Sequence, residues 1–115
     1  MRQVLLVLAL VAIAAAADAA PRPHWTVYAD CAGAYVANAR VADPGRPATM
    51  VGQMSEVAED YARAARDAVH HQREVGPRRS RELVARRIEA TAKRLSSQPR
   101  EAAERIIDAC PQTES

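Results

Sequence analysis

Apolar side chains recur every three or four residues along most of the chain, which is the spacing of one face of an α-helix. A first stripe runs from Trp25 to Ala39 and predicts a helix over residues 25–42. A second, longer stripe predicts a helix over residues 47–75, where Gly52 is expected to be a packing or bending position. The members of this second stripe are Met50, Met54, Val57, Tyr61, Ala65, Ala68 and Val75.

Residues that stop or start helices separate two further stripes. Gly76 and Pro77 end the second helix, and Gly76 is expected to take the left-handed conformation that caps many helices. Ser80 is a favourable N-cap for a third helix over residues 80–96, because its hydroxyl can accept a hydrogen bond from the first turn. A proline then interrupts the stripe, and a short fourth helix is predicted over residues 99–110.

The expected fold is all-α, a small three-to-four-helix bundle. Beyond residue 20, no segment alternates apolar and polar residues as a half-buried strand would. A chain of 115 residues is too short for two separate cores, so residues 21–115 are expected to form a single helical domain. Phe is absent and Ala is abundant, and this composition predicts closely spaced helices.

The chain contains two cysteines, Cys31 and Cys110, which lie near opposite ends of the predicted domain. Two thiols allow one intramolecular pairing, and the Cys-x-x-Cys spacing of many redox-active pairs is missing. We predict a structural disulfide between the first and last helices. Such a bond restricts the unfolded chain, which matters for a domain with so few large apolar residues.

Residues 1–20 have the composition of a cleavable signal peptide. Arg2 precedes an unbroken apolar run from Val4 to Ala17, and small residues follow at the spacing that signal peptidase reads. A spanning helix needs about 20 apolar residues, and Asp18 ends this run earlier, so no transmembrane segment is expected in the mature chain. Nearly all basic residues are Arg, which suggests a GC-rich bacterial genome and therefore a periplasmic or secreted location.

The strongest charge feature is a basic segment over residues 73–94. It holds eight basic and three acidic residues, a net charge of +5, in a chain whose formal net charge is +2. Its candidate binding surface consists of Arg78, Arg79, Arg81, Arg86 and Arg87. The same arginines could instead pair with acidic helices of the same bundle. No aromatic residue is interleaved for base stacking, so the expected partner is a protein or an anionic envelope component, and not nucleic acid.

Candidate catalytic and metal-binding groups are sparse. His70 and His71 lie near Asp67 and Glu74 at metal-ligand spacing, but adjacent residues diverge by about 100° around a helix. The acidic residues of the long helix form its polar face, with no facing group across a cleft. Nucleophile motifs and Gly-rich phosphate loops are missing. We therefore expect no enzymatic activity, no metal and no cofactor.

These features together predict an exported, non-enzymatic binding or interaction module. The alternative is a small periplasmic stress chaperone. The chain is similar in plan to the acid-activated periplasmic chaperones, which combine a signal peptide, fewer than 100 mature residues, a helical fold and one disulfide between distant cysteines. This resemblance of plan implies a bundle that loosens when acid protonates its carboxylates, and it extends to no residue motif.

Overall fold

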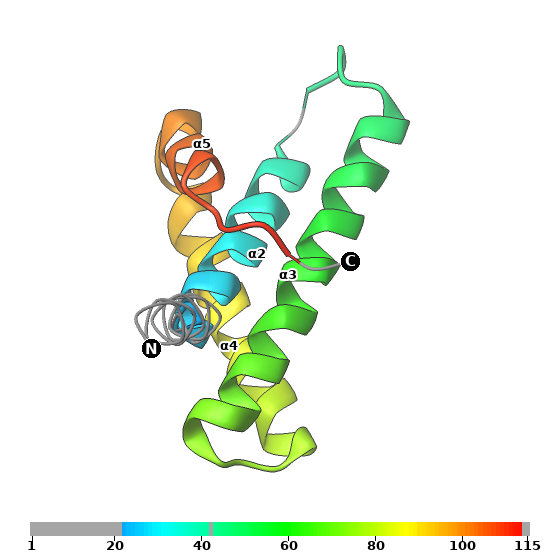
Figure 1. Ribbon diagram of the computed structural model, residues 1–115. Coiled ribbons are helices and arrows are strands. Elements are labelled where there is room, and N and C mark those ends of the chain that lie inside the picture. The colour runs from blue at the N-terminus through cyan, green and yellow to red at the C-terminus, as the bar shows by residue number, and fades with distance from the viewer. Residues whose placement is uncertain (1–21, 42, 114–115) are drawn as a thin grey trace, which may run out of the picture.

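The computed structural model describes residues 22–41 and 43–113, which form four helices in these ranges (Figure 1). In chain order the helices are α2 (Trp25–Arg40), α3 (Ala48–Arg73), α4 (Pro77–Ser96) and α5 (Arg100–Asp108). The predicted all-α fold, with a disulfide between the first and last helical regions, is confirmed. The predicted signal peptide over residues 1–20 lies outside the described residues.

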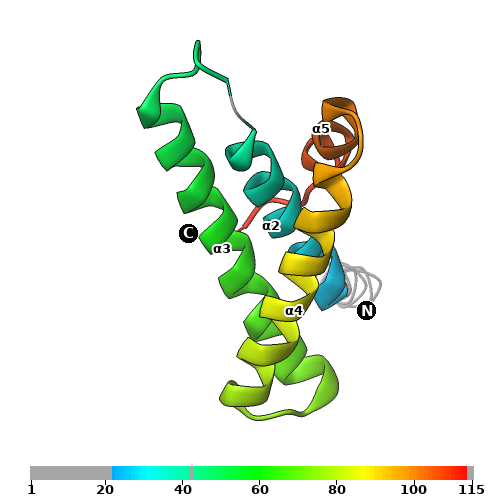
Figure 2. The same ribbon diagram turned by 180° about the vertical axis from the view of Figure 1, so that it is seen from behind.

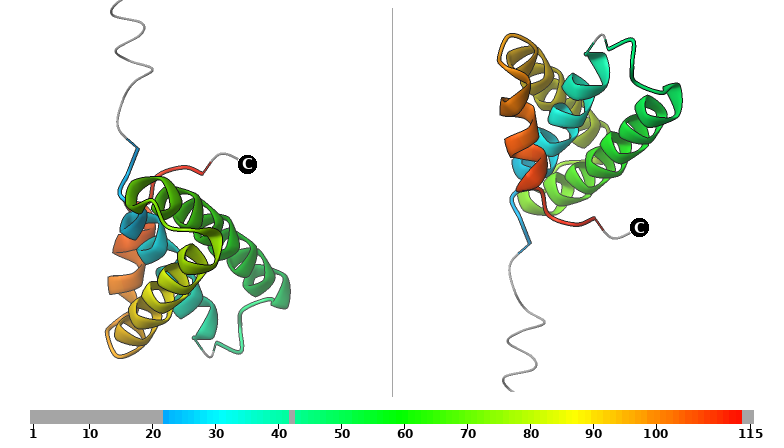
Figure 3. Two further views of the ribbon diagram at one scale, coloured as in Figure 1. Left: turned by 90° about the horizontal axis from the view of Figure 1, so that it is seen from below. Right: turned by 90° about the horizontal axis from the view of Figure 1, so that it is seen from above.

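Helix α2 is the centre of the bundle. It packs against each of the other three helices, with α3 on one side and α4 and α5 on the other (Figure 3). Its buried residues are mostly small, namely Trp25, Ala29, Cys31, Ala32, Gly33, Ala34, Ala37 and Asn38. Because small side chains let helix backbones approach closely, three neighbours fit around this one helix.

Larger side chains complete the core on both sides of α2. Near the start of α2, Trp25 packs with Val69 of α3 and Val84 of α4, both of which are fully buried. Tyr35 of α2 stacks on Tyr61 of α3, with 5.8 Å between the ring centroids. Toward the other end of α2, Leu95 of α4 packs with Ile106 and Ile107 of α5, so large residues complete the core against all three neighbours.

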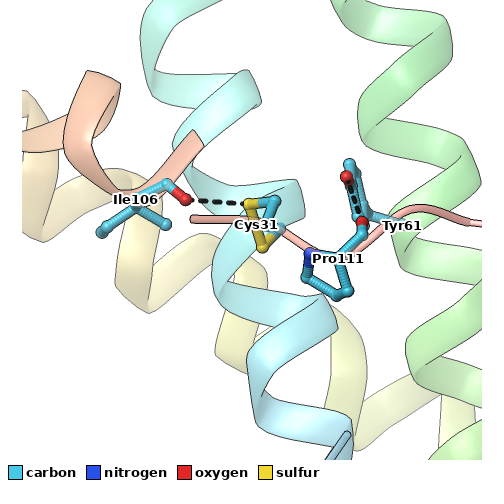
Figure 4. Close-up of a disulfide and its surroundings, with 5 residues drawn as sticks. Cys31, Tyr61, Ile106 and Pro111 are labelled. Carbon is cyan, nitrogen blue, oxygen red and sulfur yellow. Dashed lines mark hydrogen bonds between the residues drawn. A yellow bond between two sulfur atoms is a disulfide. The ribbon is translucent and has the colours of Figure 1, made fainter. Parts of the chain in front are cut away.

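The disulfide between Cys31 and Cys110 anchors the C-terminal segment (Figure 4). The two residues are 79 positions apart in sequence, and their Cα atoms are 6.0 Å apart. Cys110 follows the end of α5, so the bond fastens this segment to α2. The hydroxyl of Tyr61 in α3 donates a hydrogen bond of 2.6 Å to the carbonyl of Pro111. One short segment therefore connects α5, α2 and α3.

The disulfide also indicates where the protein folds. Such bonds persist in oxidising compartments, so the environment is oxidising and non-cytoplasmic. Within residues 22–41 and 43–113, no helix has both the length and the apolar character that crossing a bilayer requires.

The start of α4 differs from the prediction. The helix begins at Pro77, where the missing N–H has no helical partner to lose, and not at Ser80. Ser80 is buried in the first turn, and its hydroxyl donates to the carbonyl of Gly76 at 3.0 Å. Gly76 has φ of −69° and is the N-cap of α4, whereas Glu74 takes the left-handed conformation, with φ of 54°. The other helix ends differ from the predictions by two residues or fewer.

Candidate functional site

The five arginines predicted as a binding surface point in different directions from α4. Arg87 faces α2, where its guanidinium donates to the carboxylate oxygens of Asp30 at 2.8 and 3.0 Å. Thr91 donates to the same carboxylate at 2.8 Å. Burial raises the pKa of Asp30, but these hydrogen bonds and the charge of Arg87 outweigh burial and lower that pKa. Arg87 is therefore engaged within the bundle, in agreement with the alternative interpretation of the basic segment.

Arg78 and Arg79 pair locally, while Arg86 does not. The guanidinium groups of Arg78 and Arg79 lie 3.5 and 3.3 Å from the carboxylate of Glu82 on the same helix. Arg86 is exposed, and it forms no ion pair with residues 22–41 or 43–113. All three residues are exposed to solvent.

Arg81 faces α3 and lines a small basic hollow of about 290 Å³. The hollow is lined by Arg63, Arg66, Asp67, His70, Pro77, Ser80 and Arg81. Arg66 lies 2.8 Å from Glu59, and Arg63 lies 3.6 Å from Asp60. Arg81 has no ion-pair partner among the described residues. We call these seven residues the basic hollow.

A second hollow, of about 390 Å³, lies where α3 and α4 diverge over α2. Its lining is largely aliphatic, and its residues are Ala32, Val36, Ala39, Arg40, Val51, Ser55, Ala58, Glu59, Ala62 and Ile88. At its rim, Arg40 donates to both carboxylate oxygens of Glu89 at 3.2 Å. The hydrogen bond from Arg40 and its charge lower the pKa of Glu89, so this rim pair stays charged and compensated at neutral pH. We call this set the apolar hollow.

The two hollows are neighbours along α3. On α3, the residues that line the apolar hollow lie between Val51 and Ala62, and those that line the basic hollow lie between Arg63 and His70. Glu59 at the edge of the apolar hollow pairs with Arg66 of the basic hollow, so this ion pair marks their border. Figure 2 shows this side of the bundle, with α2 between α3 and α4.

No protein family, curated protein or solved structure matches this chain significantly. The candidate site is therefore defined by its geometry.

The histidines do not form a metal site within the described parts of the chain. No group of three or more His, Cys, Asp or Glu side chains there is close enough to hold a metal ion. His71 lies 3.5 Å from Asp67, and the ring of His70 is hydrogen-bonded to the carbonyl of Val75 at 2.6 Å. Each of these contacts involves one histidine and one neighbour on or near the same helix, and neither brings the two rings to a common ligand.

A third hollow, of about 460 Å³, is lined by residues of α3 and of the two ends of the described chain. Its charged residues largely compensate one another, because Arg22 pairs with Asp67 at 3.5 Å and Arg63 with Asp60 at 3.6 Å. Cationic excess is thus found in the basic hollow and not here.

The sequence does not indicate that Arg63 and Arg66 line the same hollow as Arg81. Both belong to the polar face of the long helix, where an alternation of acidic and basic residues suggests only local ion pairs. Their position opposite Arg81 depends on how α3 and α4 cross. Arg63 and Arg66 are three residues apart, which places them on one face of α3. The apolar stripes of α3 and α4 do not by themselves disclose how the two helices cross.

Proposed function

We propose that the protein is an exported, non-enzymatic binding module of the bacterial periplasm or exterior, and that its basic hollow binds anionic groups of an envelope component. The observation that carries this proposal is Arg81, an uncompensated guanidinium opposite Arg63 and Arg66. Arg63 and Arg66 are paired with Asp60 and Glu59, so the positive charge without a described partner in this hollow is that of Arg81. An anion would offset this charge.

Guanidinium chemistry defines the class of ligand. The planar fork of Arg donates two parallel hydrogen bonds, which suits phosphate and carboxylate oxygens. The hollow is small, so it would take one such group and not an extended acidic chain. Envelope lipids and their derivatives present phosphate groups in the oxidising, non-cytoplasmic environment that the disulfide indicates.

The test uses the purified, disulfide-bonded protein and sedimentation with lipid vesicles. We expect binding to vesicles that contain phosphatidylglycerol, weakening as salt is raised, and little binding to phosphatidylcholine alone. Arg81→Glu should weaken binding by about tenfold or more, since a basic residue near an anionic surface contributes ~1 kcal/mol and reversal removes more than that.

Arg86→Glu is the matched control, because Arg86 lies on the same helix, is also exposed and lies outside the basic hollow. We expect it to weaken binding less than about threefold, through the general surface field alone. An equal loss of vesicle binding in the two variants would mean that α4 acts as a positively charged surface without a specific site. Absence of vesicle binding by the unaltered protein would contradict the proposal outright.

The alternative is a small periplasmic stress chaperone that loosens when acid protonates its carboxylates. Asp30 and Glu89, which tie α2 to α4 through Arg87 and Arg40, both have lowered pKa values. Their ion pairs therefore persist in mild acid, and the stability that they contribute is lost as the pH falls further. The anion-binding module remains the leading proposal because the guanidinium of Arg81, which has no described ion-pair partner, supports it directly.

A further inference from the structure

The side of α3 that faces α4 combines an apolar hollow with a basic one. The apolar hollow receives aliphatic side chains from three helices, including Val36 of α2, Val51 of α3 and Ile88 of α4. Its volume of about 390 Å³ lies in the range of small-molecule sites, which are mostly apolar with a few polar groups at one end. The arrangement is therefore that of a site for a molecule with one apolar and one charged end.

The charge of the ligand can be inferred from the ion pairs at the two ends of the apolar hollow. At the outer rim, Arg40 and Glu89 neutralise one another through two hydrogen bonds. At the inner border, Glu59 and Arg66 pair at 2.8 Å, and beyond them Arg81 stands without a described partner. Among the arginines that line the two hollows, Arg81 is the one without an ion-pair partner in the described parts of the chain, so the charged end of the ligand is anionic.

We infer that the two hollows together form a site for a single-chain anionic lipid, with its acyl chain in the apolar hollow and its phosphate at Arg81. The inference rests on the proposed function, because it extends the same anion site by an apolar segment. A phosphate would share Arg66 with Glu59 and lie opposite Arg81, while Asp67 remains paired with Arg22. The chain would cover Val36, Val51 and Ile88, which are otherwise only half-buried.

The experiment measures binding of lipid monomers by calorimetry, below the concentration at which they form micelles. The probes are lysophosphatidylglycerol, lysophosphatidylcholine with the same acyl chain, and glycerol phosphate, which has the charge without the chain. We expect lysophosphatidylglycerol to bind at least about tenfold more tightly than either comparator, because it alone matches both hollows. Each buried methylene is worth roughly a fourfold change in affinity, so shortening the chain should weaken binding stepwise.

Two Trp substitutions on α3 test the place of the chain. Ser55 is exposed and lines the apolar hollow, so Ser55→Trp should fill it and weaken lysophosphatidylglycerol binding by about tenfold or more. Gln53 is also exposed and lies two residues away, outside that lining, so Gln53→Trp should leave affinity unchanged. Unchanged helical circular dichroism in both variants checks that each is folded.

The outcomes separate this inference from the proposed function. If Arg81→Glu abolishes binding to anionic vesicles but Ser55→Trp leaves lysophosphatidylglycerol binding intact, the anion site stands and the lipid site is wrong. Equal affinity for the two lysolipids would overturn the placement of the phosphate, and affinity independent of chain length would overturn the placement of the chain. Should Ser55→Trp fail to fold, the head-group and chain-length comparisons on the unaltered protein still decide.

Discussion

Substitution of Gly33 by Ala tests how closely α2 and α4 approach each other. A Cβ atom built at Gly33 would lie 2.7 Å from Cβ and 2.8 Å from Cγ2 of Thr91, and 3.0 Å from the carbonyl oxygen of Ile88. Thr91 is only 1% exposed, and its hydroxyl is held by Asp30 at 2.8 Å. The side chain cannot turn away without losing that hydrogen bond, so the two helices would have to separate.

The expected loss of stability follows from two opposing effects. Forcing an extra methyl group into a packed contact costs about 1 to 3 kcal/mol, whereas Ala in place of Gly within a helix contributes about 1 kcal/mol in the other direction. Two of the three close contacts are with the fully buried Thr91 side chain and the third is with the backbone, so none of these atoms can move aside easily. We therefore use the upper half of the range of about 1 to 3 kcal/mol for the cost of the extra methyl group. We expect Gly33→Ala to lower the free energy of unfolding by about 1 to 2 kcal/mol, or Tm by roughly 4 to 15 °C for a domain of this size.

Gly52→Ala is the matched control, measured by thermal and denaturant unfolding under the same conditions. Gly52 is also helical, but a Cβ there meets no atom within 4 Å. This variant should be stabilised by about 0.5 to 1 kcal/mol, through helix propensity alone. If Gly33→Ala is stabilised as much as Gly52→Ala, the close approach of α2 to α4 is wrong.

Two further predictions concern the covalent and ionic links between helices. Replacing Cys31 and Cys110 together by Ser should lower the free energy of unfolding by up to about 4.5 kcal/mol, the chain-entropy value for a bond that closes 79 residues; denaturant curves that superimpose with those of the oxidised protein would show that the bond contributes nothing. The lowered pKa of Asp30 means that its contribution is present above the pKa of the unfolded state and is lost as pH falls through the folded value, below about pH 4. Asp30→Asn should therefore reduce the loss of stability in that range, and an unaltered pH profile would argue against the contact with Arg87.

Helix positions and the disulfide could be predicted because both depend on local or discrete signals. Apolar periodicity identifies each helix face, and two cysteines leave one intramolecular pairing. The start of α4 was placed wrongly because Pro77 and Ser80 are both acceptable near a helix start. The choice between them depends on the turn before α4, where Glu74 and not Gly76 takes the left-handed conformation.

The glycines show what a stripe of residues cannot disclose. Gly52 was expected to be a packing or bending position, because it interrupts a long helix, yet it faces open space. Gly33 has no distinguishing sequence signal within an Ala-rich helix, yet a Cβ atom there would lie within 3.0 Å of the Thr91 side chain and of the Ile88 carbonyl oxygen. A glycine is needed for packing only when another helix crosses at its position, and crossings arise from the packing of whole faces.

The same reasoning explains why the basic segment was recognised but not resolved into a site. Successive residues of a helix point about 100° apart, so neighbouring arginines meet different surroundings. Arg87 meets Asp30 of α2 and holds the bundle together, whereas Arg86, one residue earlier, lies in solvent. Arg81 meets two arginines of α3 and has no described carboxylate to pair with. The charges in a sequence thus indicate that a surface is basic. The crossing of α3 and α4 decides which arginine is left without a described partner beside the apolar hollow, and that residue is Arg81. A ligand with an anionic end would gain most from binding at this position.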